Sequence, residues 1–259
     1  MAKKKTGTKE WAETNVNIQI GCEHGCRYCY ARYAAVKRHK WCTARQWKDP
    51  VIVQSKVTRS FLKRPGIVMY PSTHDVTMLN RSESICVLGN LLDAGNRVLL
   101  VSKPNMDCID DICRTFQEYR KQLSFRFTIG SMSDEVLSFW EPNAPDFQER
   151  LGCLRHAYKN GYQTSVSCEP FLDYDVNQIT GLYATCKPFI TDSFWIGKLR
   201  HFDRRVDMSG VTSEQEERFV KPLKAAQSDE VVWEIYSNPH LHLERLVRWK
   251  DSIREVIEK

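Results

Sequence analysis

Short apolar runs alternate with helix-like segments along most of the chain. The runs predict six β-strands, at residues 16–20, 66–70, 97–102, 123–130, 162–168 and 189–197. Apolar residues between these runs recur with the helical period and predict helices, at residues 31–39, 83–95, 110–122, 146–159 and 175–186. Strands that alternate with helices of this length are typical of βαβ crossovers in a parallel sheet. Six such units make an open doubly wound sheet or part of a barrel, and either architecture binds ligands beyond the carboxyl ends of its strands.

The carboxyl-terminal part follows a different pattern. Ser213 and Glu216 have the spacing of a capping box and predict a helix that runs toward residue 226. Residues 230–236 predict a seventh strand, and Asn238 with Pro239 suits the N-cap and first position of a last helix. An apolar stripe would pack this last helix on the body, formed by Leu243, Leu246, Val247, Ile253 and Ile257.

Composition adds little beyond a globular class. The 259 residues are 42% hydrophobic, and 38 basic against 32 acidic side chains give a net charge of +6. That charge is compatible with an anionic or nucleic-acid substrate but does not require one. We find no signal peptide in "MAKKKTGTKE" and no run of about 18 apolar residues that a membrane span needs. We therefore expect a cytoplasmic protein with no membrane partner, in which ten cysteines serve as ligands, catalysts or buried residues rather than disulfides.

Three of these cysteines, Cys22, Cys26 and Cys29, lie in "GCEHGCRYCY", between the first expected strand and helix. A structural zinc site usually takes four ligands in two close pairs, and no second CxxC occurs in the chain. His24 is a possible fourth ligand, but it lies between two of the cysteines. A redox dithiol would leave Cys22 unused, and the stretch is too polar and glycine-rich for a core segment.

An iron–sulfur cluster fits the three thiols better. Soft thiolates suit such clusters, and a cubane usually takes four of them. Three protein ligands leave one iron open to a small molecule, which points to chemistry at that iron rather than electron storage.

CxxxCxxC with an aromatic residue before the last cysteine resembles the signature of the radical S-adenosylmethionine (SAM) enzymes. The resemblance implies an α/β fold, a partial (β/α)6 TIM-type barrel with a short carboxyl-terminal extension. It also implies a [4Fe-4S] cluster on Cys22, Cys26 and Cys29 whose open iron binds SAM. Reductive cleavage of SAM would give a 5′-deoxyadenosyl radical that abstracts hydrogen from a substrate. Tyr28 would lie near the adenine of SAM, and a flavodoxin or ferredoxin would donate the electron.

A narrower resemblance, to the spore photoproduct lyase-like branch, covers roughly residues 16–205. It is carried by the stretch 126–129, the pair 141–142 and the helix end at 161–162. It implies that Lys103 meets the SAM carboxylate and that polar residues after two other strands face SAM, namely Ser72, Thr73, Thr128 and Ser131. Taken without the resemblance, these residues read as a solvated strand-end lysine, turn formers and an ordinary strand residue. We divide the chain into a basic arm (1–14), a radical SAM core (15–205) and an extension (206–259).

Further candidates lie near the strand ends. His74 and Asp75 could transfer protons, and Glu169 could contact SAM or substrate. Cys168 ends a strand and either reaches the mouth or lies beneath helices. The cationic stretch at residues 200–205 either meets an anionic substrate or is a solvated loop.

Two departures from the family pattern narrow the function. "PSTHD" lacks the cysteine that photoproduct lyases place there, and the nearest one, Cys86, falls on the next helix, which argues against photoproduct repair itself. The Gly-Gly-Glu stretch that is common after the second strand is also absent. Its absence weakens the hypothesis that the protein is an activase, which abstracts hydrogen from a partner protein. The main hypothesis is a radical SAM enzyme, lyase or transferase, acting on a nucleobase, nucleotide or other small molecule. The activase and a non-enzymatic iron–sulfur or zinc module remain alternatives.

Overall fold

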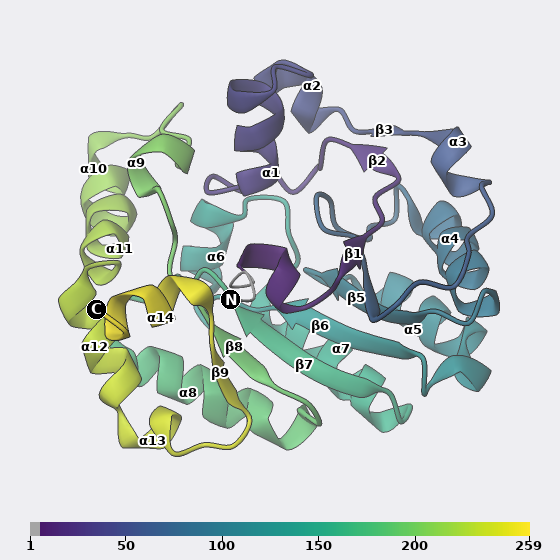
Figure 1. Cartoon of the computed structure of the whole chain (residues 1–259). Helices are drawn as coiled ribbons and strands as arrows, with labels where there is room; N and C mark the ends of the chain where they lie inside the picture. Colours follow the sequence, from purple (N-terminus) through teal and green to yellow (C-terminus); the bar gives the residue numbers. More distant parts are fainter. Residues whose placement is uncertain (1–5) are drawn as a thin grey trace.

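The computed structural model describes residues 6–259, and the first five residues of the expected basic arm lie outside this range. Seven parallel strands form one twisted sheet in the order β1-β4-β5-β6-β7-β8-β9 (Figure 1). Their bounds are Thr14–Asn15 (β1), Ile67–Tyr70 (β4), Arg97–Ser102 (β5), Leu123–Thr128 (β6), Gln163–Cys168 (β7), Phe194–Ile196 (β8) and Val247–Trp249 (β9). A separate antiparallel pair joins β2 (Gln19–Ile20) to β3 (Val51–Ile52).

Helices connect the strands as βαβ crossovers, which confirms the predicted α/β class. The four long crossover helices are α4 (Arg81–Asp93), α5 (Met106–Thr115), α7 (Phe147–Lys159) and α8 (Val176–Cys186). Shorter ones are α1 (Tyr30–Arg32), α2 (Ala44–Lys48), α3 (Gln54–Val57), α6 (Asp134–Trp140) and α9 (Phe202–Arg205). The carboxyl-terminal part adds α10 (Ser213–Gln215), α11 (Lys221–Ala226), α12 (Asp229–Ser237), α13 (Pro239–His242) and α14 (Asp251–Ile257). Short 3-10 helices are η1 (Gly7–Glu10), η3 (Gln117–Tyr119) and η4 (Lys187–Phe189), and π-helical segments are η2 (Tyr33–Arg38) and η5 (Glu216–Val220). None of the helices within residues 6–259 is long and apolar enough to cross a membrane.

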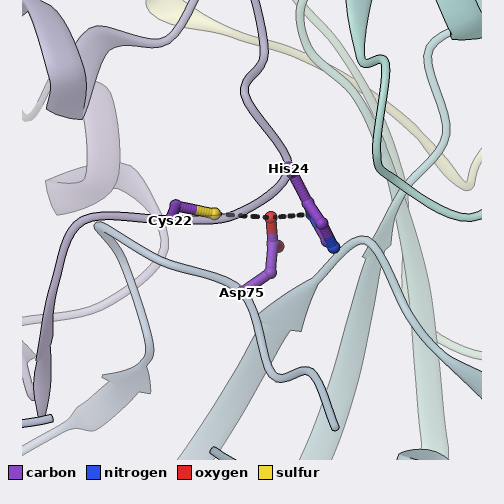
Figure 2. A group of neighbouring side chains, drawn as sticks. All are labelled: Cys22, His24 and Asp75. Atoms are coloured by element: carbon purple, nitrogen blue, oxygen red, sulfur yellow. Dashed lines mark hydrogen bonds and ion pairs between the residues drawn. The ribbon is translucent and has the colours of Figure 1, made fainter. Parts of the chain in front are cut away.

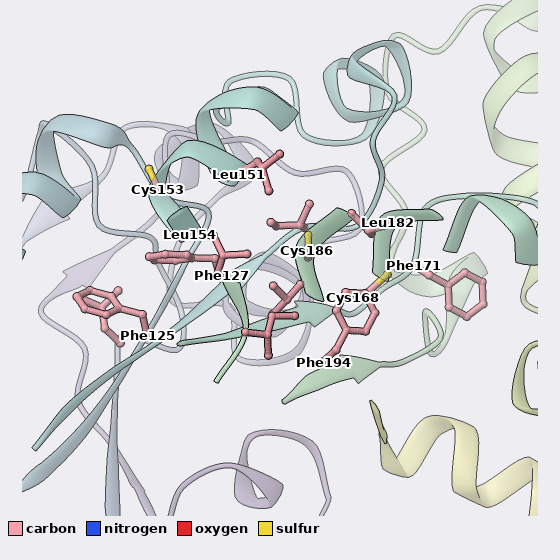
Figure 3. Packing of buried hydrophobic residues seen from close by; sticks show 14 of the residues in the cluster. Phe125, Phe127, Leu151, Cys153, Leu154, Cys168, Phe171, Leu182, Cys186 and Phe194 are labelled. Carbon is pink, nitrogen blue, oxygen red and sulfur yellow. The ribbon is translucent and has the colours of Figure 1, made fainter. Parts of the chain in front are cut away.

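The main core lies between the sheet and its covering helices. Figure 3 shows Phe125, Phe127 and Phe194 from the strands packed with Leu154 of α7 and Leu182 of α8, and all five are fully buried. Burying one such side chain contributes about 1.5–3 kcal/mol. Three cysteines of the crossover units lie in the same layer, namely Cys153, Cys168 and Cys186.

Cys168 therefore lies beneath the helices and not at the mouth of the barrel. Its Sγ faces the carbonyl of Gly130 at 3.9 Å, and the residue has no exposed surface.

The first expected strand, 16–20, is wrong in its extent. The chain pairs with β4 at residues 14–16, bends at Asn17, and then pairs with β3. The bend arises because Asn17 Oδ1 accepts hydrogen bonds from the backbone N–H groups of Ser72 and Thr73, at 2.7 and 2.9 Å. The backbone N–H of Ile18 donates to His74 Nε2 at 3.2 Å, so side chains replace the ladder of a continuous strand.

The strand expected at 230–236 is also wrong, because these residues form helix α12. Ser228 caps the helix by accepting a hydrogen bond from the Val231 N–H at 3.3 Å, and acidic residues occupy the first turn. Val232 and Ile235 lie three residues apart and are both fully buried, while Trp233 between them is exposed. That spacing belongs to one face of a helix.

The prediction of one last helix after residue 238 is also partly wrong. Asn238 caps Pro239 as predicted, but the helix α13 that they begin lasts only four residues. Val247–Trp249 instead pairs with β8, so the seventh strand comes from β9, and α14 follows it. The capping box of α10 lies one residue earlier than expected, at Thr212 and Gln215.

The amino-terminal residues 7–11, here called the strap, connect the two edges of the sheet. The strap precedes edge strand β1 and crosses the open face of the sheet toward α14, which follows edge strand β9 (Figure 1). Gly7 N donates to Asp251 Oδ2 at 3.1 Å, and Glu10 forms an ion pair with the buried Lys250 at 2.7 Å. Trp11 meets Trp195 of β8 edge to face, with ring centroids 5.9 Å apart.

Candidate active site

The cysteine loop, residues 21–29, lies over the carboxyl ends of the strands. It contacts the turn after β4 through Asp75, and its Arg27 N–H donates to the carbonyl of Trp140 at the end of α6, at 2.9 Å. Asn143 N donates to the carbonyl of His24 at 3.2 Å. These contacts hold the loop at the end of the sheet where α/β folds bind ligands, as the sequence predicts.

The three thiols of the cysteine loop are largely removed from solvent. Cys22 and Cys26 are buried and Cys29 is half-buried. Burial raises the pKa of Cys22 to about 12, and the neighbouring Asp75 and Cys29 raise it further. Burial likewise raises the pKa of Cys26 well above its usual value, and Cys29 and Cys22 add to this. Burial disfavours the thiolate forms of Cys22 and Cys26, and a bound cation stabilises thiolates, so three thiols from one short loop form a donor set suited to a bound cation. The residues present therefore fit an iron–sulfur cluster.

Figure 2 shows a second donor set that shares one of these thiols. Asp75 Oδ2 lies 2.8 Å from His24 Nδ1 and 4.0 Å from Cys22 Sγ. Sulfur, nitrogen and oxygen ligand atoms of the three residues all lie within 4.8 Å of one another. This trio has the ligand types of a mononuclear zinc site. The fold thus turns His24 toward a carboxylate that no local sequence pattern indicates.

Asp75 also fixes Lys103. Its Oδ1 accepts hydrogen bonds from the Lys103 N–H at 2.8 Å and the Ser102 hydroxyl at 3.2 Å, and its Oδ2 lies 3.6 Å from Lys103 Nζ. Burial acts to raise the pKa of Asp75, but Lys103 and His24 outweigh it, so the pKa falls well below the usual range. Burial acts to lower the pKa of Lys103, but Asp75 and Cys26 outweigh it, and the pKa rises well above its usual value. A charged ammonium therefore lies beside the cysteine loop.

A second buried carboxylate, Glu141, holds the other half of the loop. Tyr28 donates its hydroxyl hydrogen bond to Glu141 Oε1, and Arg150 of α7 forms an ion pair with Oε2 at 2.5 Å. Arg150 also donates to the carbonyls of Pro145 and Thr128, at 2.7 and 3.2 Å. Burial acts to raise the pKa of Glu141, but Arg150 and Lys103 outweigh it and lower the pKa. The sequence analysis found the Glu-Pro turn, but it missed this ion pair.

The turn after β4 holds Ser72, Thr73 and His74. Asn17 accepts from the backbone N–H groups of Ser72 and Thr73, and its Nδ2 donates to Ser72 Oγ at 3.0 Å. His74 accepts from Ile18 at Nε2 and lies 3.1 Å from the Asp75 carbonyl at Nδ1. Burial lowers the pKa of His74 to about 4. The imidazole is thus neutral near pH 7, with both ring nitrogens occupied by backbone groups.

The remaining candidates lie at the ends of β6 and β7. Ser131 donates its hydroxyl hydrogen bond to Asp173 Oδ1 and accepts one from Ser133 N at 2.9 Å. Within residues 6–259, Asp173 Oδ2 has no hydrogen-bond partner although it is buried, and burial raises the pKa of Asp173 to about 6. The sequence analysis missed Asp173. Thr128 is half-buried at the end of β6.

Glu169 follows β7 and faces Lys250, whose Nζ lies 3.4 Å from its Oε2. Burial raises the pKa of Glu169, although Lys250 acts against it. The structure therefore groups the candidates around three carboxylates, those of Asp75, Glu141 and Asp173, with Glu169 beside the strap.

Sequence comparison gives distant, uncharacterised relatives. The chain is 27% identical over 173 residues to a protein of Acidianus two-tailed virus, with 62% of this chain and 55% of that protein covered. It is 23% identical over 180 residues to a protein of Methanocaldococcus jannaschii, with 67% and 66% covered. The match thus spans less than two thirds of either relative. No family model matches the chain.

Structural comparison is more informative. Spore photoproduct lyase complexed with dinucleoside spore photoproduct superposes with a TM-score of 0.52, covering 82% of this chain and 72% of the lyase at 13% identity. Streptococcus suis SuiB bound to its precursor peptide SuiA gives a TM-score of 0.54, covering 95% of this chain and 50% of SuiB at 8% identity. Both are radical SAM enzymes. The chain shares the fold of these two enzymes.

This shared fold confirms the predicted partial barrel. Sequence identities of 8% and 13% are evidence for a shared fold alone.

Proposed function

We propose that the protein is a radical SAM enzyme, with a [4Fe-4S] cluster held by Cys22, Cys26 and Cys29. The observation that carries the proposal is the cysteine loop itself: in a radical SAM fold, two buried carboxylates anchor it over the strand ends. When bound, the cluster and SAM supply a 5′-deoxyadenosyl radical that abstracts hydrogen from a substrate.

The residues of the chain bind and orient SAM around that loop. The charged Lys103 ammonium pairs with the SAM carboxylate, and Asp75 holds Lys103 in place. Ser72, Thr73 and Thr128 offer polar groups at neighbouring strand ends, and Ser131 acts with Asp173. Tyr28 lies beneath the adenine, with its ring fixed by Glu141. His74 and Asp75 are proposed to shape this pocket, because both His74 ring nitrogens contact backbone groups and Asp75 stays ionised, and Glu169, whose pKa burial raises, is proposed to manage protons in it.

The substrate class we favour is a nucleobase, a nucleotide or another small molecule. One solved neighbour is complexed with a dinucleoside and another with a precursor peptide, so the fold accommodates both kinds of ligand in related proteins. We further propose a flavodoxin or ferredoxin donor, a cytoplasmic location and the division of the chain at residues 14 and 205.

A zinc module is a second candidate, because Cys22, His24 and Asp75 offer a compact mixed donor set. The two proposals can be distinguished by substituting residues that only one of them requires. The cluster needs Cys26 and Cys29, whereas the zinc site needs His24.

The test is anaerobic reconstitution with iron and sulfide, followed by dithionite and SAM, with 5′-deoxyadenosine and bound metals measured. We expect the wild type and Cys86→Ala, a matched control at an exposed cysteine of α4, to hold iron and form 5′-deoxyadenosine. Cys26→Ala should do neither. Zinc that survives in Cys26→Ala but is lost in His24→Ala, with no SAM cleavage in the wild type, would replace the enzyme by the zinc module.

A further inference from the structure

The strongest unassigned feature is a groove of about 550 Å³ beside the cysteine loop. We propose that this groove binds the acidic surface of a one-electron carrier protein, an inference that rests on the proposed function. The groove, here called the basic groove, lies between the helical segment 30–38, helix α2 and residues 204–209. Its cationic lining consists of Arg32, Lys37, Arg45, Lys48, Arg204 and Arg205.

Most of these cations are free to meet a partner. Among residues 6–259, no acidic side chain forms an ion pair with Lys37, Arg45, Lys48 or Arg204. The one acidic residue of the lining, Asp207, is already paired with Arg32 and accepts hydrogen bonds from Ser209. The groove therefore presents a net positive surface, which attracts an anionic partner over long range at low salt.

Two arginines of the groove lining, Arg32 and Arg205, also contact the cysteine loop. Arg32 N donates to Cys29 Sγ at 3.4 Å, and Arg205 Nη2 donates to the carbonyl of Tyr28 at 3.1 Å. The groups proposed to bind SAM approach the loop from the strand ends instead, as Lys103 does through Asp75. A partner that contacts Arg32 in the groove thus lies next to a residue whose backbone N–H binds a proposed cluster ligand, Cys29.

This position suits an electron carrier better than a substrate. A substrate must bring its reacting C–H bond into contact with the radical, whereas an electron passes between groups that do not touch. One electron leaves the carrier, which is oxidised by one equivalent, and enters the cluster, which is reduced by one. Electron-transfer complexes are small and transient, and complementary charge gives them speed rather than high affinity.

An exposed aromatic residue lies in the segment that forms one wall. Trp41 is 73% exposed and stacks on His39, with ring centroids 4.6 Å apart. It lies in sequence between Lys37 and Ala44, which both line the groove, and its N–H is fixed to the carbonyl of Ala35 at 2.8 Å. An exposed tryptophan in the chain segment that carries these unpaired cations is the kind of residue that anchors protein interfaces.

The test uses the full chain with Arg45→Glu and Lys48→Glu combined. The control combines Lys63→Glu with Lys159→Glu, which makes the same charge change at exposed sites outside the groove lining. Binding of oxidised flavodoxin, and separately of ferredoxin, is measured by isothermal titration at 50 and 300 mM salt. Cluster reduction is followed by stopped-flow absorbance, with the hydroquinone flavodoxin and with dithionite as donors. A 12-nucleotide single strand serves as a competing polyanion.

We expect the groove variant to bind at least one carrier about tenfold more weakly and to be reduced by flavodoxin about tenfold more slowly. Dithionite reduction should stay at the wild-type rate, and the control variant should match the wild type. Wild-type carrier binding by the groove variant, or no carrier binding by the wild type, would overturn the inference. So would loss of oligonucleotide binding alone, which would assign the groove to nucleic acid. Failure of the proposed function appears separately, as a cluster that dithionite reduces without SAM cleavage.

Discussion

Asp173 is a carboxylate with only half of its hydrogen-bonding capacity used. Oδ1 accepts from Ser131, while the buried Oδ2 has no partner among the described residues. An unpaired buried charge is costly, so the fold favours the protonated acid, and the pKa rises from 3.8 to about 6. Such a group at the strand ends is available to a ligand that donates a hydrogen bond.

Asp173→Asn should remove a pH dependence of stability. The unfolded carboxyl titrates near 3.8 and the folded one near 6, so the wild type is stabilised by the bound proton below pH 4 and loses that stability as the pH rises through 6. Asparagine mimics the protonated acid. We expect the variant to gain up to about 3 kcal/mol over the wild type at pH 7.5 and little at pH 4. Urea unfolding of both proteins at the two pH values measures this, and an equal difference at both would contradict it.

The sequence analysis found residues whose partners are close in sequence. It missed contacts between residues that are far apart in sequence. The three thiols can be recognised from their spacing within one short stretch, and their loop lies where the strand–helix pattern predicts. Glu141 contacts Tyr28 across 113 residues of sequence, and Asp173 contacts Ser131 across 42. No periodic pattern encodes such pairs, because they form only when different strands end at the same edge of a sheet.

At the scale of elements, the cysteine loop begins at a glycine pressed against helix α2. Gly21 has φ +93°, and a Cβ there would lie 2.6 Å from the carbonyl oxygen of Trp47. The same carbonyl accepts the hydrogen bond of Cys22 N at 3.0 Å. The approach of α2 and the position of the first thiol therefore depend on the missing side chain.

Gly21→Ala should displace the loop and reduce iron loading. The clash and the positive φ together are expected to cost about 1–3 kcal/mol, and part of this will move Cys22 away from the other thiols. Gly210→Ala is the matched control, because its φ is +70° and nothing lies within 4 Å of the added Cβ. Iron and sulfide per chain after reconstitution, with urea unfolding, measure both effects. Full iron loading of Gly21→Ala would contradict this prediction and show that helix α2 moves while the cysteine loop keeps its position.

The two mistaken elements of the carboxyl-terminal part have one physical cause. Residues 230–236 are rich in β-branched and aromatic side chains, so their composition favours a strand, yet a good N-cap and burial at positions 232 and 235 select a helix. Residues 247–249 continue an apolar stripe but find an open sheet edge beside β8, and pairing there outweighs helical propensity. Tertiary partners decide both cases.

At the scale of the whole molecule, the strap joins the two edges of the sheet through a buried ion pair. Lys250 is 1% exposed and contacts Glu10, the carbonyl of Gly7 and the ring of Trp11, whose centroid lies 4.1 Å from Nζ. The more distant Glu169 offers a second carboxylate at 3.4 Å.

Glu10→Ala should destabilise the fold because it leaves the Lys250 ammonium buried without its nearest carboxylate. A loss of about 3–5 kcal/mol is expected from removal of one partner of such a pair. Adding Lys250→Met should recover much of the loss, since the uncompensated charge is then gone. Urea unfolding of the wild type, both single variants and the double variant gives the coupling energy. Additive single effects would show that the pair contributes little beyond packing.

The strap also imposes an order on biosynthesis. Its contacts with Lys250 and Asp251 join residues more than 240 positions apart, so they form only after nearly all of the described chain has been made. Strands β1 to β8, with the cysteine loop above them, can assemble from nearer partners before that. The inner face of the sheet therefore stays open to the surroundings during synthesis until the strap docks across it.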